Sequence, residues 1–346
     1  MQSRLLTLAF IMLAVLTCLQ SAFAQSDKRR MVFLSISADT KARVGSQQEW
    51  IEMLQGVGAD RVSSKTARLG IAGVKETETT RGTVVSVTGF IEGTKLKLPG
   101  GTFSLRDKAG IRNLIQKIRD DGARVALAEK KAFGLTSEQL VYLHQKFAQR
   151  VDFSTKGQNA GEVIGKLVAK SGINLVLDPA ARAAASGDEV VSEELNGMSI
   201  GMALATIARP LGLVVEPKRE QGKPIEVHLL DSTRSTENWP IGWPIEQPPV
   251  SVEPKLFVQI PIQIQNFPLE DVLKALEKRA KVPFFFDHNS MAREGIELAD
   301  VKVTVASKKI AILTAVSRAL KQTKPKMFYE IRLDETGKPF LWLSVR

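Results

Sequence analysis

The sequence predicts an α+β protein, with an N-terminal mixed α and β domain followed by two small α+β modules. Two observations predict this class. Strand-like and helix-like segments alternate along the whole chain, and their order in residues 151–230 returns in residues 255–346. Because each copy offers two amphipathic helices and a few short strands, each is expected to fold as one compact α+β module.

Residues 1–24 have the features of a secretory signal peptide. Arg4 supplies a positive charge, an apolar core follows, and Ala22-Phe23-Ala24 has the small-x-small pattern of a cleavage site. A transmembrane anchor is the alternative, but the apolar core is short for a bilayer span. We therefore expect cleavage after Ala24 and a periplasmic or secreted mature protein in a bacterial envelope.

Cys18 is the only cysteine, and it lies inside the predicted leader. Thr17 stands before it, where a lipoprotein signal requires a small residue, so lipid attachment is not expected. Once the leader is removed, the mature chain has no thiol. This excludes a disulfide framework, a zinc–thiolate site and a cysteine nucleophile.

The protein is basic, with a formal net charge of +11, and the charge is uneven along the chain. Residues 25–150 hold 22 Lys and Arg against 13 Asp and Glu, and residues 255–346 hold 16 against 10. Such a protein is attracted to anionic lipid, wall polymers or an acidic partner, although a dispersed, solvated basic surface is the alternative. A nucleic-acid partner is not expected, because the aromatic residues are not interleaved with basic runs.

Residues 25–150 form the predicted basic N-terminal domain, which resembles no known type. Its predicted elements follow in chain order: a strand over 31–36, a helix over 50–55 opened by a capping box at 46–49, a polar loop over 61–81, strands over 83–88 and 95–98, an amphipathic helix after 104–107, and a helix over 137–149. Apolar residues at helical spacing or in alternation predict each of these elements.

The repeat extends from residue 151 to the end of the chain, with an offset of 109 residues. The first helix of each copy is predicted around 162–168 and 271–277. Three apolar residues of the second helix recur at the same offset: Leu204, Ile207 and Leu211, then Leu313, Val316 and Leu320. Each copy closes on a hairpin with Gly-Lys-Pro at its turn.

Between the two copies, residues 231–254 form a predicted linker rich in proline and tryptophan. Proline at this density prevents a helix and predicts a semi-rigid spacer. Trp239 and Trp243 either pack against the protein or stack on a sugar. We favour the packed linker.

The repeated pattern is a helix at 162–168, a strand that ends at Asp178, a turn at 196–199 and a helix that ends in Leu211-Gly212-Leu213. In this pattern each copy resembles the short N-terminal domain shared by secretins and TonB-dependent transducers. The second copy departs from it at 321–324, where Lys-Gln-Thr-Lys replaces the expected Gly-Leu.

This resemblance implies a periplasmic protein–protein interaction module that performs no chemistry. In that family a pore domain or a barrel usually follows, and neither follows here, so the expected role is an adaptor or scaffold. Its expected partner is an envelope, secretion or transport protein. A binder of anionic cell-wall or lipid polymers, through residues 25–150, is the alternative.

No constellation of residues predicts catalysis, a cofactor or a metal site. His144, His228 and His288 have no second ligand at metal spacing. Asp178 and Asp287 end equivalent strands, which predicts turn or helix-capping residues in two different modules. No Gly-x-Ser-x-Gly motif or phosphate loop is present. We expect a non-enzymatic protein; a hydrolase with an unfamiliar site in the first domain is the remaining alternative.

Four lysines of the second copy are the candidate partner-binding residues. Lys308 and Lys309 form one basic pair, and Lys324 and Lys326 lie in a second basic run. Their charge would suit an acidic partner. Solvated loop lysines are the alternative interpretation.

Overall fold

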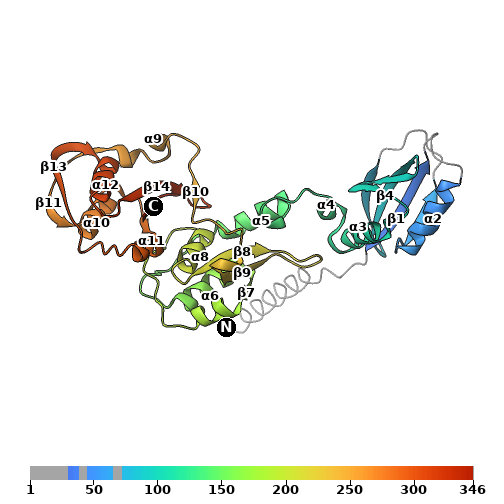
Figure 1. Ribbon diagram of the computed structural model, residues 1–346, viewed down its shortest axis with the longest axis horizontal. Helices are drawn as coiled ribbons and strands as arrows, with labels where there is room; N and C mark the ends of the chain where they lie inside the picture. The colour runs from blue at the N-terminus through green and yellow to red at the C-terminus, as the bar shows by residue number, and fades with distance from the viewer. Residues whose placement is uncertain (1–29, 39–44, 65–71, 346) are drawn as a thin grey trace, which may run out of the picture. The chain divides into compact units, whose positions relative to one another are not determined.

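The computed structural model describes residues 30–38, 45–64 and 72–345, and it is α+β as predicted (Figure 1). The predicted leader, its cleavage site and Cys18 lie outside these residues. The chain divides into two compact units. One runs to Glu129 and includes Gln221–Lys223, and the other comprises Lys130–Glu220 and Pro224–Arg346. Within the described ranges, no helix has the length and apolar character needed to cross a membrane.

The first unit is built on one mixed sheet. Strands β2, β1, β4, β5 and β6 follow one another in that order, and β3 pairs with β4 on the edge that β5 also uses. Strand β1 is parallel to both of its neighbours, and the other pairs are antiparallel. The strands are β1 (Arg30–Ala38), β2 (Arg61–Ser64), β3 (Gly73–Thr79), β4 (Gly82–Glu92), β5 (Lys95–Leu98) and β6 (Gly101–Phe103).

Three helices complete this unit: α2 (Ser46–Gly56), α3 (Lys108–Asp121) and α4 (Ala123–Ala126). Strand β1 alternates, so that Val32, Leu34 and Ile36 are buried together. They share one core with Trp50 of α2 and with isoleucines spaced at one helical turn on α3. The apolar faces of β1 and α3 therefore belong to the same core.

Two local predictions for this unit were wrong. No capping box opens α2: the helix begins at Ser46 after Gly45, which has a left-handed φ of 88°, and no side chain caps it. Ser46 is buried instead, and its hydroxyl has no hydrogen-bond partner among the described residues. The predicted loop over 61–81 contains β2 and β3. Strand β3 is polar and exposed, so its pairing with β4 and not apolar burial defines it.

Helix α5 (Ser137–Phe147) belongs to the second unit, so the domain boundary differs from the predicted one at residue 150. The helix begins as predicted at Thr136, where the side chains of Thr136 and Gln139 form a capping box. However, Leu143 and Phe147 are buried in the core of the second unit. The boundary therefore lies near residue 129 and not at residue 150, because the apolar face of α5 finds its partner in the module that follows it.

The first module places two main helices against a three-stranded sheet of order β7-β9-β8 (Figure 1). Strands β8 and β9 are antiparallel, as the terminal hairpin predicts, and β7 is parallel to β9. The elements are α6 (Ala160–Ser171), β7 (Asn174–Leu177), α7 (Pro179–Ala185), α8 (Ile200–Ala208), β8 (Leu213–Lys218) and β9 (Glu226–Asp231). Residues of β8 alternate between buried and half-buried, as in a sheet with one covered face.

The second module repeats this arrangement. Helices α10 and α11 begin 109 residues after α6 and α7, and the strand order β12-β15-β14 has the same parallel and antiparallel pairs as β7-β9-β8. The elements are β11 (Gln259–Pro268), α10 (Leu269–Ala280), β12 (Phe284–Phe286), α11 (His288–Arg293), β13 (Lys302–Ala311), α12 (Ile312–Leu320), β14 (Met327–Leu333) and β15 (Pro339–Val345).

The two modules differ in one pair of strands. In the second module β11 and β13 form a long antiparallel ribbon. In the first module the described residues have only isolated bridges at the matching places, Arg150 to Ser199 and Asn159 to Val190. Loop segments therefore replace the ribbon in the first module.

The segment between the modules is packed, as we favoured. Trp239 is 4% exposed in the core of the first module, and β10 (Trp243–Pro244) pairs with the end of β14. The segment also contains α9 (Pro249–Val252) and the 3₁₀ helices η2 (Ser232–Arg234) and η3 (Pro254–Phe257); a third, η1 (Ala132–Gly134), precedes α5. Because Trp239 is buried and Trp243 is half-buried against the modules, this segment holds them together and does not act as a spacer.

Candidate functional site between the two modules

A buried carboxylate of the second module caps a helix of the first. Glu335 lies in the turn between β14 and β15 and is 7% exposed. Its Oε2 accepts the hydroxyl of Ser199 and, at 3.2 Å, the N–H of Met202, while Oε1 accepts the indole N–H of Trp239 at 2.5 Å. Ser199 is the N-cap of α8, but its own side chain makes no capping bond. Glu335 therefore satisfies one N–H group, that of Met202, which this helix start leaves free.

The neighbouring residues of this turn also contact the first module. Asp334 accepts the N–H of Ser199 at 3.0 Å and the N–H of Lys338 at 2.9 Å. The ammonium of Lys338 donates to the carbonyl of Gly197 at 3.1 Å, and burial lowers the pKa of Lys338. The turn is thus held to the first module at both of its ends.

An arginine–aspartate pair joins the modules at the other end of α8. Arg209 donates Nε and Nη2 to the two carboxylate oxygens of Asp287, at 2.9 and 2.7 Å. Asp287 is also the N-cap of α11, as predicted, and Asn289 donates to the carbonyl of Arg209 at 2.6 Å. Burial acts to raise the pKa of Asp287, but the bonds from Arg209 outweigh it, so this pKa lies below the usual 3.8.

Glu193 of the first module forms a third connection. Its Oε1 lies 2.8 Å from Nε2 of His288 and accepts the N–H of Phe286 at 3.3 Å. In the first module, the polar contacts therefore come from the loop before α8 and from both ends of α8. In the second module, they come from the end of β12, the residues that follow it, and the turn that precedes β15.

Apolar packing fills the seam between these contacts. Phe285, Phe340 and Trp342 belong to the buried cluster of the first module, and the rings of Phe285 and Phe340 meet edge to face at 5.5 Å. Leu341 and Leu343 alternate with them and pack into the core of the second module. Strand β15 is therefore buried on both faces, and the two modules form a single packed body.

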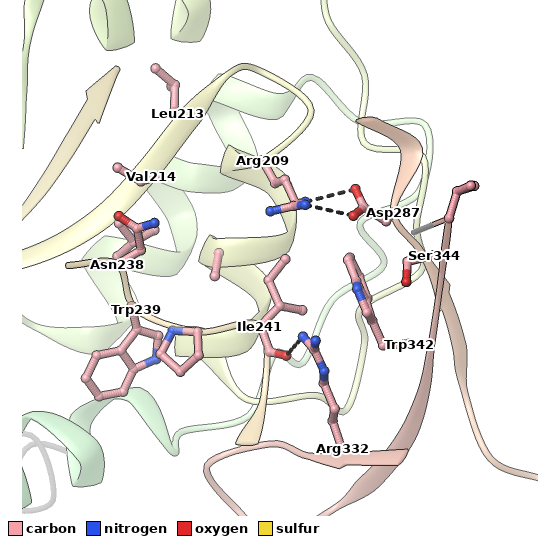
Figure 2. A pocket seen from close by; sticks show the side chains of 14 residues that line it. Arg209, Leu213, Val214, Asn238, Trp239, Ile241, Asp287, Arg332, Trp342 and Ser344 are labelled. Carbon is pink, nitrogen blue, oxygen red and sulfur yellow. Dashed lines mark hydrogen bonds and ion pairs between the residues drawn. The ribbon is translucent and has the colours of Figure 1, made fainter. Parts of the chain in front are cut away.

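A cavity of about 410 Å³ lies along this seam, and we call it the seam cavity (Figure 2). Its walls come from both modules and from the segment between them: Ala205, Arg209, Leu213, Val214, Val215, Asn238, Trp239, Pro240, Ile241, Asp287, Arg332, Trp342, Ser344 and Val345. In Figure 2 the paired Arg209 and Asp287 lie between β8 on one side and Trp342 and Ser344 on the other. Its volume is in the range of ligand-binding cavities.

The two arginines of the seam cavity differ in what they can offer a ligand. Arg332 donates Nε and Nη2 to Glu330, and its Nη1 donates to the carbonyl of Ile241 at 2.9 Å. Arg209 donates Nε and Nη2 to Asp287, and no described residue accepts a hydrogen bond from its Nη1. Its side chain is 48% exposed. Arg209 can therefore donate to a carboxylate that enters the cavity.

The four candidate lysines lie elsewhere. Lys308 and Lys309 are exposed near the end of β13, and Lys324 and Lys326 are exposed in the turn between α12 and β14. Helix α12 has nine residues, about 13 Å of helix, so the two pairs lie at its opposite ends. None of the four lines the seam cavity.

Reversing the charge of all four lysines to glutamate tests them as partner-binding residues. Because all four are exposed, we expect weaker capture of an acidic partner with no decrease in melting temperature. Capture from an envelope extract at two salt concentrations, together with a thermal unfolding curve, measures both effects. Capture equal to that of the unchanged protein would remove these lysines from the binding surface.

The other singled-out residues have local structural partners. His144 stacks against Trp243 at 6.2 Å, and His228 lies 3.5 Å from Glu226. Asp178 caps α7, with its carboxylate accepting the N–H of Ala181 at 2.7 Å. In the ranges that the structure describes, no group of three or more His, Cys, Asp or Glu side chains is placed to hold a metal ion.

Sequence reasoning named Asp287, His288 and Trp239 but not their partners across the seam, and it missed Glu335, Arg209 and Glu193. Glu335 follows Asp334 in a turn with Gly337, where a solvated glutamate is the ordinary expectation. One signal was present: β15 is almost continuously apolar, whereas β9, its counterpart in the first module, alternates. A strand that is apolar on both faces indicates burial on both faces.

Comparison with known proteins assigns no family to this chain. No family model matches it, and neither a curated protein nor a solved structure does so. The resemblance to the short domain of secretins and TonB-dependent transducers stays a prediction from the sequence pattern.

Proposed function

We propose that this protein is an exported, non-enzymatic adaptor of the bacterial cell envelope, and that its two modules bind one partner segment in the seam cavity. One observation carries the proposal. The seam cavity takes its walls from both modules and from the segment between them, so it is a cavity that neither module has alone. Such shared cavities are common places for ligands to bind.

The chemistry of the cavity suits an acidic group of the partner. Because no described residue accepts a hydrogen bond from Nη1 of Arg209, this donor favours a carboxylate as the ligand. Ser344 and Asn238 add polar groups nearby. The indole rings of Trp239 and Trp342 supply apolar walls. Arg209 is already oriented by its two bonds to Asp287, so little side-chain freedom is lost when it binds a carboxylate.

A double variant, Arg209→Gln with Asp287→Asn, tests this site without stranding a buried charge. Asparagine is a good helix N-cap, and the amide pair can keep a hydrogen bond, so the fold should be retained within about 1 kcal/mol. We expect capture of the partner from an envelope extract to fall at least tenfold. Mass spectrometry of the captured proteins at low and high salt measures this.

The control is Lys255→Gln, since Lys255 is exposed, forms a long ion pair of 3.8 Å with Glu253 and does not line the cavity. It should leave capture unchanged. Equal capture by the double variant and by this control would exclude the seam cavity as the partner site. If no envelope protein is captured at all, the adaptor proposal itself fails.

A second candidate function rests on the charge of the first unit. Residues 25–129 hold 18 Lys and Arg against 12 Asp and Glu, and Lys108, Arg112 and Lys117 are exposed on α3. We propose binding to anionic wall or lipid polymer as the alternative role of this unit. Sedimentation of the mature protein with envelope fractions, lost at high salt and retained by residues 25–129 alone, would favour it.

A further inference from the structure

A second cavity, which we call the apolar pocket, lies beside the seam cavity in the same unit. Its volume is about 470 Å³, and its walls are mostly apolar. Phe133, Leu140 and His144 form one side of it, and Trp239, Pro240 and Trp243 form the other. Cavities with aromatic walls of this kind accept large apolar side chains, which are the common anchors of protein interfaces.

The aromatic walls are held in place by one another. Trp239 stacks with Phe133 at 5.9 Å and meets Trp243 edge to face at 5.4 Å. His144 stacks on the far ring, Trp243, at 6.2 Å. Trp239 is fixed in addition by its hydrogen bond to Glu335. The pocket is therefore largely preformed, and an incoming side chain would meet rings that are already in position.

Phe133 has an unusual backbone conformation. Its φ of 58° lies in the left-handed region, which glycine adopts readily and bulky residues rarely adopt. The carboxylate of Glu237 accepts its N–H at 2.5 Å and so holds this conformation. Strained backbone of this kind concentrates at ligand-binding sites. Here it directs the ring of Phe133 against Trp239 and into the pocket wall.

The apolar pocket adjoins the seam cavity. Asn238, Trp239 and Pro240 line both cavities. A ligand that passes over these three residues would reach an apolar pocket on one side and the guanidinium of Arg209 on the other.

We propose that the two cavities bind one extended peptide segment of the partner, with a large apolar side chain in the apolar pocket and an acidic side chain at Arg209. This inference rests on the proposed adaptor function and specifies the partner. Charge complementarity at Arg209 and the shared wall of the two cavities select this occupant. An organic cation is the other occupant that aromatic walls can accept, and the competition experiment below distinguishes the two.

The probe is a phage library of random twelve-residue peptides, selected on the mature protein. We expect the enriched peptides to share a large apolar residue and, a few positions away, Asp or Glu. One enriched peptide is then synthesised, and its Kd is measured by fluorescence anisotropy. Leu140→Gln should weaken it at least tenfold, and the Arg209→Gln/Asp287→Asn variant should remove the preference for the acidic peptide over its amide version.

The control variant is Phe267→Gln, since Phe267 is 55% exposed on β11 and lines neither cavity. It should bind the peptide as the unchanged protein does. Because Leu140→Gln could disturb folding, a second readout uses the unchanged protein. The peptide should shift its tryptophan emission, whereas the same peptide with alanine in place of its apolar residue should not.

Three results would overturn the inference. These are enrichment of no common motif, binding that Leu140→Gln leaves unchanged, and competition by tetramethylammonium but not by the N-acetyl amide of the apolar anchor residue. If any of these occurs while the seam variant still loses capture of an envelope protein, the inference fails and the adaptor function stands. If, in addition, the unchanged protein captures no envelope protein, the adaptor function fails as well.

Discussion

Replacing Glu335 with alanine is expected to lower the free energy of unfolding of the second unit by about 3 kcal/mol. The change leaves the buried indole N–H of Trp239 and the N–H of Met202 without acceptors, and each stranded donor costs about 1–3 kcal/mol. Part of this cost is offset, because the unchanged protein has to bury a carboxylate. The effect should be large because one side chain serves a helix start, an indole and the hydroxyl of Ser199 together.

Urea unfolding followed by tryptophan fluorescence measures this loss. Three of the four tryptophans, Trp239, Trp243 and Trp342, lie in the second unit and report on it, whereas Trp50 reports on the first. The matched control is Glu297→Ala, an exposed glutamate of the same module, which should change stability by less than about 0.5 kcal/mol. A loss below about 1 kcal/mol for Glu335→Ala would show that this carboxylate does not hold the modules together.

The same residue predicts a pH dependence that Glu335→Gln should reduce. Burial raises the pKa of Glu335 above the usual 4.5 in the folded state. Its contribution to stability is therefore complete below about pH 4.5 and is lost as the pH rises through the folded-state value. Asp287 does not interfere between pH 4.5 and 7.5, because its pKa lies below 3.8.

We therefore expect the unchanged protein to lose stability relative to the Gln variant as the pH rises from 4.5 to 7.5. Urea unfolding of the two proteins at each pH gives the difference in free energy directly. A difference that stays constant across this range would contradict the assignment of a raised pKa to Glu335.

Replacing Gly161 with alanine is expected to destabilise the first module by roughly 2–3 kcal/mol. Gly161 lies in the first turn of α6, where α7 ends against it. A methyl group there would overlap the carbonyl oxygen of Ala185 and lie 2.8 Å from its carbonyl carbon. Because both clashing atoms belong to the backbone, the two helices would have to move apart, and forced repacking of this kind costs about 1–3 kcal/mol.

Gly165 provides the matched control one turn further along the same helix. It is exposed, and a methyl group added there meets nothing within 4 Å. Gly165→Ala should therefore stabilise the module by about 0.5–1 kcal/mol, because alanine restricts the unfolded chain and favours the helix. Thermal unfolding of the two variants should move in opposite directions. A stabilised Gly161→Ala would show that α6 and α7 are not in close contact.

Local patterns in the sequence determined several elements of this protein. The helix caps at Asp178 and Asp287 and the apolar faces of α6 and α10 are found where the pattern predicts them. Each depends on residues within one or two turns of the chain, so a single sequence contains the whole interaction. The polar strand β3 was missed, because its partner β4 and not its own composition defines it.

Only the tertiary structure decided how the two modules are joined. Glu335 lies 136 positions from Ser199, and Asp287 lies 78 positions from Arg209. Nothing close to either residue in the sequence indicates that it is buried or which group it meets. The apolar run of β15 indicates a second buried face, but not the surface that covers it. The seam cavity exists only where the two modules pack together, and for this physical reason the sequence alone predicts two modules and the structure shows one packed unit.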